Sequence, residues 1–133
     1  MDSTEMKTIE VAVGVIKRDN KIYISKRADD LHQGGKWEFP GGKCETDETI
    51  EQALARELSE EIGIQVTKQS HLMLIEHDYG DKKVRLNVCL VENFEGAASH
   101  QEGQQSRWVD INDLNNFTFP DANKLIINKL IDL

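Results

Sequence analysis

Three glutamates close together in the sequence have the residue type and spacing of a metal site. Glu57, Glu60 and Glu61 are three and four residues apart, so on a helix their carboxylates fall within about 100° of one face. Like charges placed this way cost roughly 0.2 to 0.5 kcal/mol per pair, and a bound cation would relieve the repulsion. Carboxylate oxygens without histidine or cysteine favour Mg²⁺ or Mn²⁺ over zinc. The same charge run is also typical of a solvated helix face, and the spacing alone leaves both interpretations open.

A hard cation of this kind usually completes its coordination with substrate phosphates, which points to a phosphoanhydride or phosphoester as the ligand. Gly41 and Gly42 stand before the acidic segment and permit a close approach of the backbone to metal or phosphate. Arg56 directly precedes Glu57. It could orient Glu48 or Glu57, or it could be a plain surface charge.

The helix that must carry these carboxylates is predicted at about residues 47–62. Its apolar residues recur every four positions and form one stripe: Ile50, Leu54, Leu58 and Ile62. Thr46 or Asp47 is the expected N-terminal cap, and Gly63 is the expected C-terminal stop. Glu57 and Glu61 therefore border the side of the helix that faces the core.

Strands are predicted on both sides of this helix, from β-branched and alternating apolar runs bounded by turn residues. They cover residues 8–16, 21–27, 36–39, 71–79, 83–94 and 106–111. A C-terminal helix is expected from Pro120, with its apolar residues mostly in the core: Leu125, Ile126, Ile127, Leu130 and Ile131. Hairpins that flank a helix favour an α+β fold, in which a mixed sheet lies between helices as an αβα sandwich.

Length and charge limit the organisation and the partners. The 133 residues fit a single domain spanning 1–133, with residues 1–7 expected to be loose. A formal net charge of −8 repels polyanions, so we expect no binding to nucleic-acid polymers. Cys44 and Cys89 are far apart and read as free thiols. The chain has no long apolar run, so we expect no membrane association and a cytoplasmic setting. A monomer is the default expectation.

The acidic segment resembles the Nudix box, whose pattern is G-x5-E-x7-R-E-U-x-E-E-x-G-U with U a bulky apolar residue. Every fixed position of the pattern is filled, over 23 residues, by Gly42, Glu48, Arg56, Glu57, Leu58, Glu60, Glu61, Gly63 and Ile64. So many matches at fixed spacing favour the metal site over the solvated helix face. The chain is identified by this motif as a member of the Nudix hydrolase family.

The resemblance extends over nearly the whole chain to the MutT branch of the family, the 8-oxo-dGTP diphosphatases. It is carried by VAVGVI at 11–16, ISKRADDLHQGGKWEFPGGK at 24–43, CLVENFEG at 89–96, EGQQSRWV at 102–109 and FPDANKLIINKL at 119–130. The resemblance implies a Nudix αβα sandwich and Mg²⁺-dependent attack of water on a phosphorus of a nucleoside triphosphate. The products would be the monophosphate and pyrophosphate, and the enzyme would cleanse the nucleotide pool.

By the same resemblance, the metal ligands would be Glu57, Glu60 and Glu61, joined by the Gly41 carbonyl and Glu102. Either Glu57 or Glu102 would be the catalytic base. Arg56 and Glu48 would hold the loop and the helix of the box in place.

A base pocket is implied by the residues outside the box. Asn123 matches the asparagine that reads the purine, and its amide offers both a donor and an acceptor. The rest of the substrate site would comprise Arg27, His32, Phe39, Gly42 and the backbone near Tyr79. At positions where the best-known members have large aromatic residues this chain has Asn87 and Cys89, a difference that predicts weaker selection of oxidised guanine.

Two other functions remain open on the sequence. The same chemistry could serve another phosphoanhydride, such as a cytidine nucleotide, a dinucleoside polyphosphate, a nucleotide sugar or a thiamine-pathway phosphate. The chain could also be a non-catalytic Nudix module that senses a nucleotide. The complete set of Glu57, Glu60 and Glu61 speaks against the second alternative.

Overall fold

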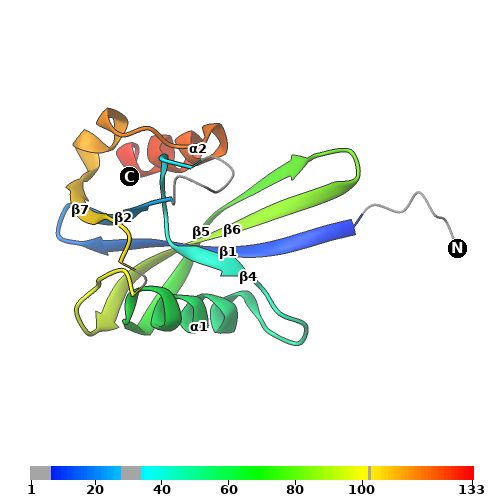
Figure 1. Ribbon diagram of the computed structural model, residues 1–133, viewed down its shortest axis with the longest axis horizontal. Coiled ribbons are helices and arrows are strands. Elements are labelled where there is room, and N and C mark those ends of the chain that lie inside the picture. Colours follow the sequence, from blue (N-terminus) through cyan, green and yellow to red (C-terminus); the bar gives the residue numbers. More distant parts are fainter. Residues whose placement is uncertain (1–6, 28–33, 102) are drawn as a thin grey trace, which may run out of the picture.

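A mixed seven-stranded sheet organises the molecule, as seen in a computed structural model that describes residues 7–27, 34–101 and 103–133 (Figure 1). The strands are β1 Lys7–Arg18, β2 Lys21–Lys26, β3 Trp37–Glu38, β4 Gly41–Lys43, β5 Gln65–Asp78, β6 Lys82–Glu95 and β7 Ser106–Asp110. Their main order is β3-β2-β1-β6-β5, with β4 paired to β1 and β7 paired to β2. β1 and β6 run parallel, and the other pairs are antiparallel.

Two helices cover opposite faces of this sheet, α1 (Ile50–Ile62) and α2 (Asp121–Ile131) (Figure 1). Each face has its own hydrophobic core. The core beneath α1 contains Leu54, Leu58 and Ile62, and it meets the sheet at Ala12, Tyr23 and Cys89 among others. The expected αβα sandwich with a mixed sheet is therefore the observed fold.

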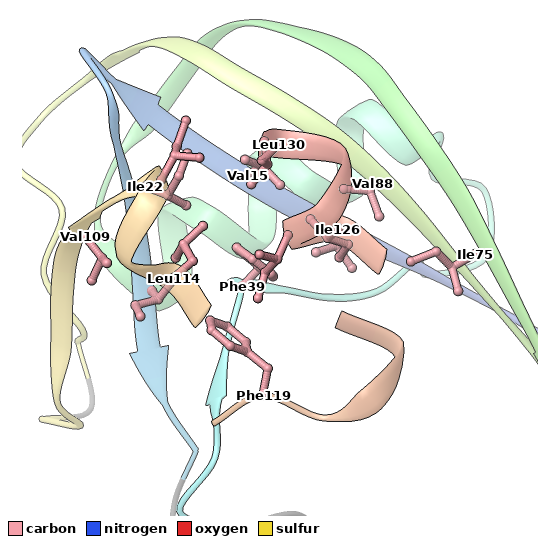
Figure 2. Packing of buried hydrophobic residues seen from close by; sticks show 14 residues of the cluster. Val15, Ile22, Phe39, Ile75, Val88, Val109, Leu114, Phe119, Ile126 and Leu130 are labelled. Atoms are coloured by element: carbon pink, nitrogen blue, oxygen red, sulfur yellow. The ribbon is translucent and has the colours of Figure 1, made fainter. Parts of the chain in front are cut away.

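The core beneath α2 brings together residues from both ends of the chain (Figure 2). Ile126 and Leu130 of α2 pack over Val15 of β1 and over Phe39, which follows β3. Burying a large apolar side chain contributes about 1.5 to 3 kcal/mol, so these contacts hold α2 firmly on the sheet. The consequence for the site is that Asn123, on the first turn of α2, has a fixed position above the sheet.

The caps of α1 differ from the predicted ones at the N-terminus. Thr49 is the N-cap and forms a capping box with Gln52, so the helix begins at Ile50 rather than near residue 47. Asp47 cannot serve as the cap, because its φ of 74° is far from the extended backbone that a cap requires. Gly63 ends the helix in the left-handed conformation, as predicted.

Several other elements also depart from the expected ones. The glycine pair is not a plain turn but forms β4, which pairs with residues 11–13 of β1. β5 begins six residues earlier than predicted and carries β-bulges between Val66 and Met73, which break the alternation on which the prediction relied. A short 3₁₀ helix, Ile111–Asn116, was not predicted. β1, β2, β6 and β7 lie close to their predicted positions.

The C-terminal helix is less buried than expected. Ile126, Ile127 and Leu130 are buried, whereas Leu125 is 51% exposed and Ile131 is 43% exposed. A single helix face can meet the sheet, and residues about 100° to either side of that face point to solvent. Both cysteines are free thiols, as predicted. Burial, followed by the charge of Glu51, raises the pKa of Cys89 to about 11.

Candidate active site

Arg56 gathers the carboxylates of α1 and of the loop before it. Its Nε and Nη2 donate to the two oxygens of Glu48 at 2.7 and 2.9 Å. Its Nη1 donates to Glu57 Oε1 at 2.9 Å and to Glu60 Oε1 at 3.0 Å. Nη2 also reaches the Lys43 carbonyl at 3.2 Å. The arginine therefore ties the loop before α1 to the C-terminal half of the helix, and it offsets part of the like-charge repulsion that the sequence predicts.

Glu48 has a structural place in this cluster. Besides its two bonds from Arg56, it accepts a hydrogen bond from the backbone N–H of Glu45. Hydrogen bonds to the ionised form favour that form. The donors of Arg56, followed by the N–H of Glu45, lower the pKa of Glu48 to about 2. Glu48 therefore stays ionised at neutral pH and keeps Arg56 oriented.

The glycine pair brings the backbone of β4 against two neighbours. A Cβ atom on Gly42 would lie 2.7 Å from Oε1 of Glu57, so only glycine leaves room for that carboxylate. A Cβ atom on Gly41 would come within 2.9 Å of the Val13 Cα on β1. The pair therefore sets how closely the carboxylates of α1 approach the edge of the sheet.

A pocket of about 390 Å³ lies on the other side of the glycine pair. Its lining residues come from β1, β3, β4, β6 and α2: Val11, Val13, Arg27, Glu38, Phe39, Gly41, Gly42, Lys43, Leu86, Pro120 and Asn123. The structure thus brings Arg27, Phe39, Gly42 and Asn123 to one cavity, although Arg27 and Asn123 are almost a hundred residues apart in the sequence. Because Gly42 lines the pocket and also touches Glu57, the pocket and the carboxylate cluster share a wall.

The apolar wall of the pocket is held by stacked aromatic rings. Phe39 stacks on Phe119 with centroids 5.1 Å apart and an interplanar angle of 19°, and the two rings lie together beneath α2 (Figure 2). Arg27 Nη1 donates to Glu38 Oε1 at 3.2 Å, across the pair of strands β2 and β3. A half-buried ion pair therefore stands next to a rigid aromatic surface, which suits a flat ligand with polar edges.

Comparison with known proteins decides the family. The model of the NUDIX domain matches residues 11–129. The chain belongs to the Nudix family. It is similar to 8-oxo-dGTP diphosphatase of Escherichia coli K12, with 44% identity over 94% of this chain and 98% of that protein. It is also similar to CTP pyrophosphohydrolase of the same organism, with 39% identity over 77% of this chain and 76% of that protein.

Among solved structures, the Nudix fold of this chain matches a MutT structure from work on the Aliivibrio salmonicida and Vibrio cholerae proteins. The TM-score is 0.86 at 41% identity, and the match covers 95% of this chain and 98% of that one. Membership of the family makes this chain a Nudix hydrolase, which acts on a pyrophosphate bond.

Nudix hydrolases need a divalent cation, and the donors on α1 fit one in chemical type. Glu57 and Glu60 already place one oxygen each on the same positive centre, Nη1 of Arg56. Within residues 7–27, 34–101 and 103–133, no three histidine, cysteine, aspartate or glutamate side chains are gathered as a metal site. In this structure Arg56 supplies the positive charge that these two carboxylates face.

Other predicted site residues lie apart from the pocket or outside the described part of the chain. Tyr79 is 59% exposed near the tip of the β5–β6 hairpin, where it packs on His77, and it does not line this pocket. His32 and Glu102 lie outside the described residues. Their roles stay predictions.

Asn87 and Cys89 do not line this pocket, and their expected effect on base selection stays a prediction. Asn87 donates to Glu10 and to the Val11 carbonyl, and Cys89 packs in the core beneath α1. The residue of β6 that lines the pocket is Leu86. Successive side chains of a strand point to opposite faces, so the side chains of Asn87 and Cys89 lie on the face away from Leu86.

Sequence reasoning missed two polar residues of the pocket, Glu38 and Lys43. Glu38 looked like an ordinary strand residue, and Lys43 looked like the end of a turn. The available signal was the opposite charge of Arg27 and Glu38 on adjacent predicted strands, since such residues commonly pair across a sheet. Lys43 directly follows the glycine pair and lines the pocket from β4.

Proposed function

We propose that this Nudix hydrolase converts 8-oxo-dGTP and water into 8-oxo-dGMP and pyrophosphate with Mg²⁺, for which Mn²⁺ can substitute. The observation that carries the proposal is the shared wall at Gly42, which joins the pocket of Arg27, Phe39 and Asn123 to the carboxylate of Glu57. A base in the pocket would place its phosphates over the carboxylates. The similarity to proteins named 8-oxo-dGTP diphosphatase supports the choice of base.

In this proposal Asn123 reads the edge of the purine. Its amide can donate and accept at the same time, and it lies half-buried on the first turn of α2. Phe39, backed by Phe119, provides the surface for the ring, and Arg27 with Glu38 supplies further polar contacts at the rim. A site built to hydrogen-bond a substrate group rejects analogues that lack the group, because its own polar atoms are then left unpaired.

The reaction adds a water oxygen to phosphorus and breaks the anhydride that links the α- and β-phosphates. The cation, when held by Glu57, Glu60 and Glu61 with the Gly41 carbonyl, would supply Lewis-acid stabilisation of charge on the phosphate oxygens. Glu57 or Glu102 would take the proton of the attacking water. Arg56 and Glu48 would keep the loop and α1 in register during turnover.

The test is a comparison of kcat/KM for 8-oxo-dGTP, dGTP and CTP with purified protein and Mg²⁺. We expect a much higher value for 8-oxo-dGTP than for dGTP, with pyrophosphate and the monophosphate as products. Comparable values for the two guanine nucleotides would contradict the selectivity. Glu57→Gln in the same assay controls for a contaminating phosphatase, because it should abolish the activity of the preparation.

A cytidine nucleotide is the second candidate substrate, favoured by the similarity to a CTP pyrophosphohydrolase. The carboxylate cluster determines which bond is cut, whereas the pocket determines which base is held, so both candidates share one chemistry. A higher kcat/KM for CTP than for 8-oxo-dGTP would select it. Turnover only of a dinucleoside polyphosphate, a nucleotide sugar or a thiamine-pathway phosphate would reject both, and inertness on every compound would indicate a nucleotide-sensing module.

We further propose that residues 1–133 act as one Nudix domain, as a monomer in the cytoplasm, on free nucleotides rather than on nucleic-acid polymers. The net charge of −8 supports the last point. In the described part of the chain, no helix is long and apolar enough to cross a membrane. Light scattering coupled to gel filtration measures the mass, and a value of twice 15.1 kDa would contradict the monomer.

A further inference from the structure

A tyrosine hydroxyl is buried beneath α1 without a hydrogen-bond partner. Tyr23 on β2 is 1% exposed, and its Oη makes no hydrogen bond within the described residues. Leaving a buried polar group unsatisfied costs about 1 to 3 kcal/mol, so such a group in a folded protein calls for an explanation. Phenylalanine would fill the same space without that cost. The hydroxyl therefore has a use that packing does not explain.

The ring of Tyr23 is held in one orientation. It meets Trp108 of β7 edge-on, with centroids 5.5 Å apart and an interplanar angle of 67°. Tyr23 and Trp108 are also direct partners in the β2–β7 ladder. On the other side, the ring belongs to the core formed by Leu58 and Ile62 of α1. Tyr23 therefore lies in the core between the sheet and the last turns of α1.

Beyond the effect of burial, Glu61 is the residue of α1 whose negative charge raises the pKa of the Tyr23 hydroxyl. Burial is the largest influence that raises the pKa of Tyr23, and the charge of Glu61 raises it further. Ser106 also lies close and favours the ionised phenol, although its hydroxyl does not complete a hydrogen bond with Oη. The backbone of Glu61 is tied to the loop that leads into β7, the strand paired with β2, since its carbonyl accepts the N–H of Gln101 at 2.9 Å. The neighbouring hydroxyl offers a proton, and the carboxylate is an acceptor.

We propose that Tyr23 is a positioning residue for the metal site: its hydroxyl donates a hydrogen bond to the Glu61 carboxylate, directly or through one water, and holds it in the orientation that binds the cation. The inference rests on the proposed role of Glu61 as a metal ligand. Groups that orient metal ligands typically change metal affinity by about 10- to 100-fold when they are removed. Arg56 orients Glu57 and Glu60 from the solvent side, and Tyr23 orients Glu61 from the core side.

The test compares Mn²⁺ binding to the free wild-type protein, Tyr23→Phe and Ser25→Ala, followed by electron paramagnetic resonance. Tyr23→Phe keeps the ring and removes only the hydroxyl. Ser25 is a matched control, because it is also fully buried on β2, its hydroxyl is also unpaired within the described residues, and it points to the same face. We expect about tenfold weaker Mn²⁺ binding for Tyr23→Phe, unchanged binding for Ser25→Ala, and no loss of melting temperature in either variant.

Activity gives a second readout that a purely structural role would not produce. Tyr23→Phe should need a higher Mg²⁺ concentration for half-maximal rate, and its kcat should recover at saturating Mg²⁺. Unchanged Mn²⁺ affinity in Tyr23→Phe would overturn the inference. An equal loss in Ser25→Ala would overturn it too, because the effect would then belong to the packing around β2.

Glu61→Gln separates the inference from the proposed function. If Glu61→Gln weakens Mn²⁺ binding and Tyr23→Phe does not, then Glu61 is a metal ligand but Tyr23 does not position it. Unchanged Mn²⁺ binding in Glu61→Gln would show that Glu61 is not a metal ligand, and the inference about Tyr23 would then be wrong. The proposed activity on 8-oxo-dGTP is tested independently by the comparison of kcat/KM values.

Discussion

The carboxylate cluster on α1 and the pocket beneath α2 are built in opposite ways. The cluster draws its residues from one short segment, between Glu45 and Glu60, and holds them by ion pairs of partly exposed side chains. The pocket draws its residues from five elements spread between Val11 and Asn123 and rests on buried aromatic packing. Half-exposed charged side chains can change partners, whereas close-packed interiors cannot deform without cost.

This difference assigns separate tasks to the two regions. In the proposed function, a cluster whose carboxylates bind a cation would perform the same bond cleavage on many phosphoanhydrides. A rigid pocket can select one base. The two regions meet at Gly42, so changes on the cluster side should lower the rate for all substrates alike, and changes on the pocket side should alter the ranking of substrates.

The largest effect is expected from Glu57→Gln. Removing this carboxylate's charge takes away a proposed metal ligand and one of the two candidate bases, so we expect kcat to fall by about 10²- to 10⁴-fold. The loss should be the same for 8-oxo-dGTP and dGTP. Steady-state kinetics with both nucleotides provide the measurement. A loss confined to one nucleotide would show that Glu57 takes part in base selection and would break the division of tasks.

Gly42→Ala tests the shared wall. The new Cβ would lie 2.7 Å from Oε1 of Glu57, and displacing a reacting group by about 1 Å can cost about 100-fold in rate. Gly80→Ala is the control, because nothing lies within 4 Å of its added Cβ. Gly80 has a positive φ, so this control carries backbone strain without contact with the site. Equal kcat values for Gly42→Ala and the wild type would mean that Glu57 does not need its place against β4.

The same contrast explains what the sequence could predict. The spacing of Glu57, Glu60 and Glu61 fixes their relative places because a helix has a regular geometry, and the pattern of the box identifies the family from local residues. The spacing does not decide which carboxylates pair with Arg56, because several lie within reach of its side chain. The pocket could be predicted only through resemblance, because no local rule brings residue 27 near residue 123.

Some features could be predicted neither from local spacing nor from the resemblance to the family. The β-bulges of β5 interrupt the alternation of its side chains, so its first residues gave no strand signal. The N-cap, by contrast, was open to prediction, because Thr49 followed three residues later by Gln52 is the sequence pattern of a capping box. The unpaired hydroxyl of Tyr23 is visible only when β2, β7 and α1 are assembled, because in the sequence it is one more aromatic residue in a strand.

Asn123→Ala should change selectivity more than rate. Losing the side-chain amide leaves polar atoms of the purine unpaired in the pocket, so we expect kcat/KM for 8-oxo-dGTP to fall by roughly tenfold or more, corresponding to about 1 to 3 kcal/mol. The value for dGTP should fall less. Asn128→Ala, on an exposed position of the same helix, serves as the control. A uniform loss for both nucleotides would indicate that Asn123 supports α2 rather than reading the base.

The smallest effect is expected on stability at acidic pH, through Glu48→Gln. The pKa of Glu48 in the folded protein is about 2, because Arg56 and then the N–H of Glu45 stabilise the carboxylate, whereas the ordinary value is 4.5. A lowered pKa contributes stability that is fully present above about pH 4.5 and is lost as the pH falls toward 2. The variant should therefore melt slightly below the wild type at pH 7, and the two melting curves should converge between pH 4.5 and 2.

Melting temperatures measured across that range check the expectation, with Glu95→Gln, which removes one exposed charge from β6, as the control. Convergence for Glu48→Gln but not for the control would place the acid sensitivity in the Arg56 cluster. A constant gap for Glu48→Gln down to pH 2 would contradict the role of Arg56 in holding that carboxylate ionised. It would also weaken the contrast between the two regions, since the cluster would then be held by something other than exchangeable charge.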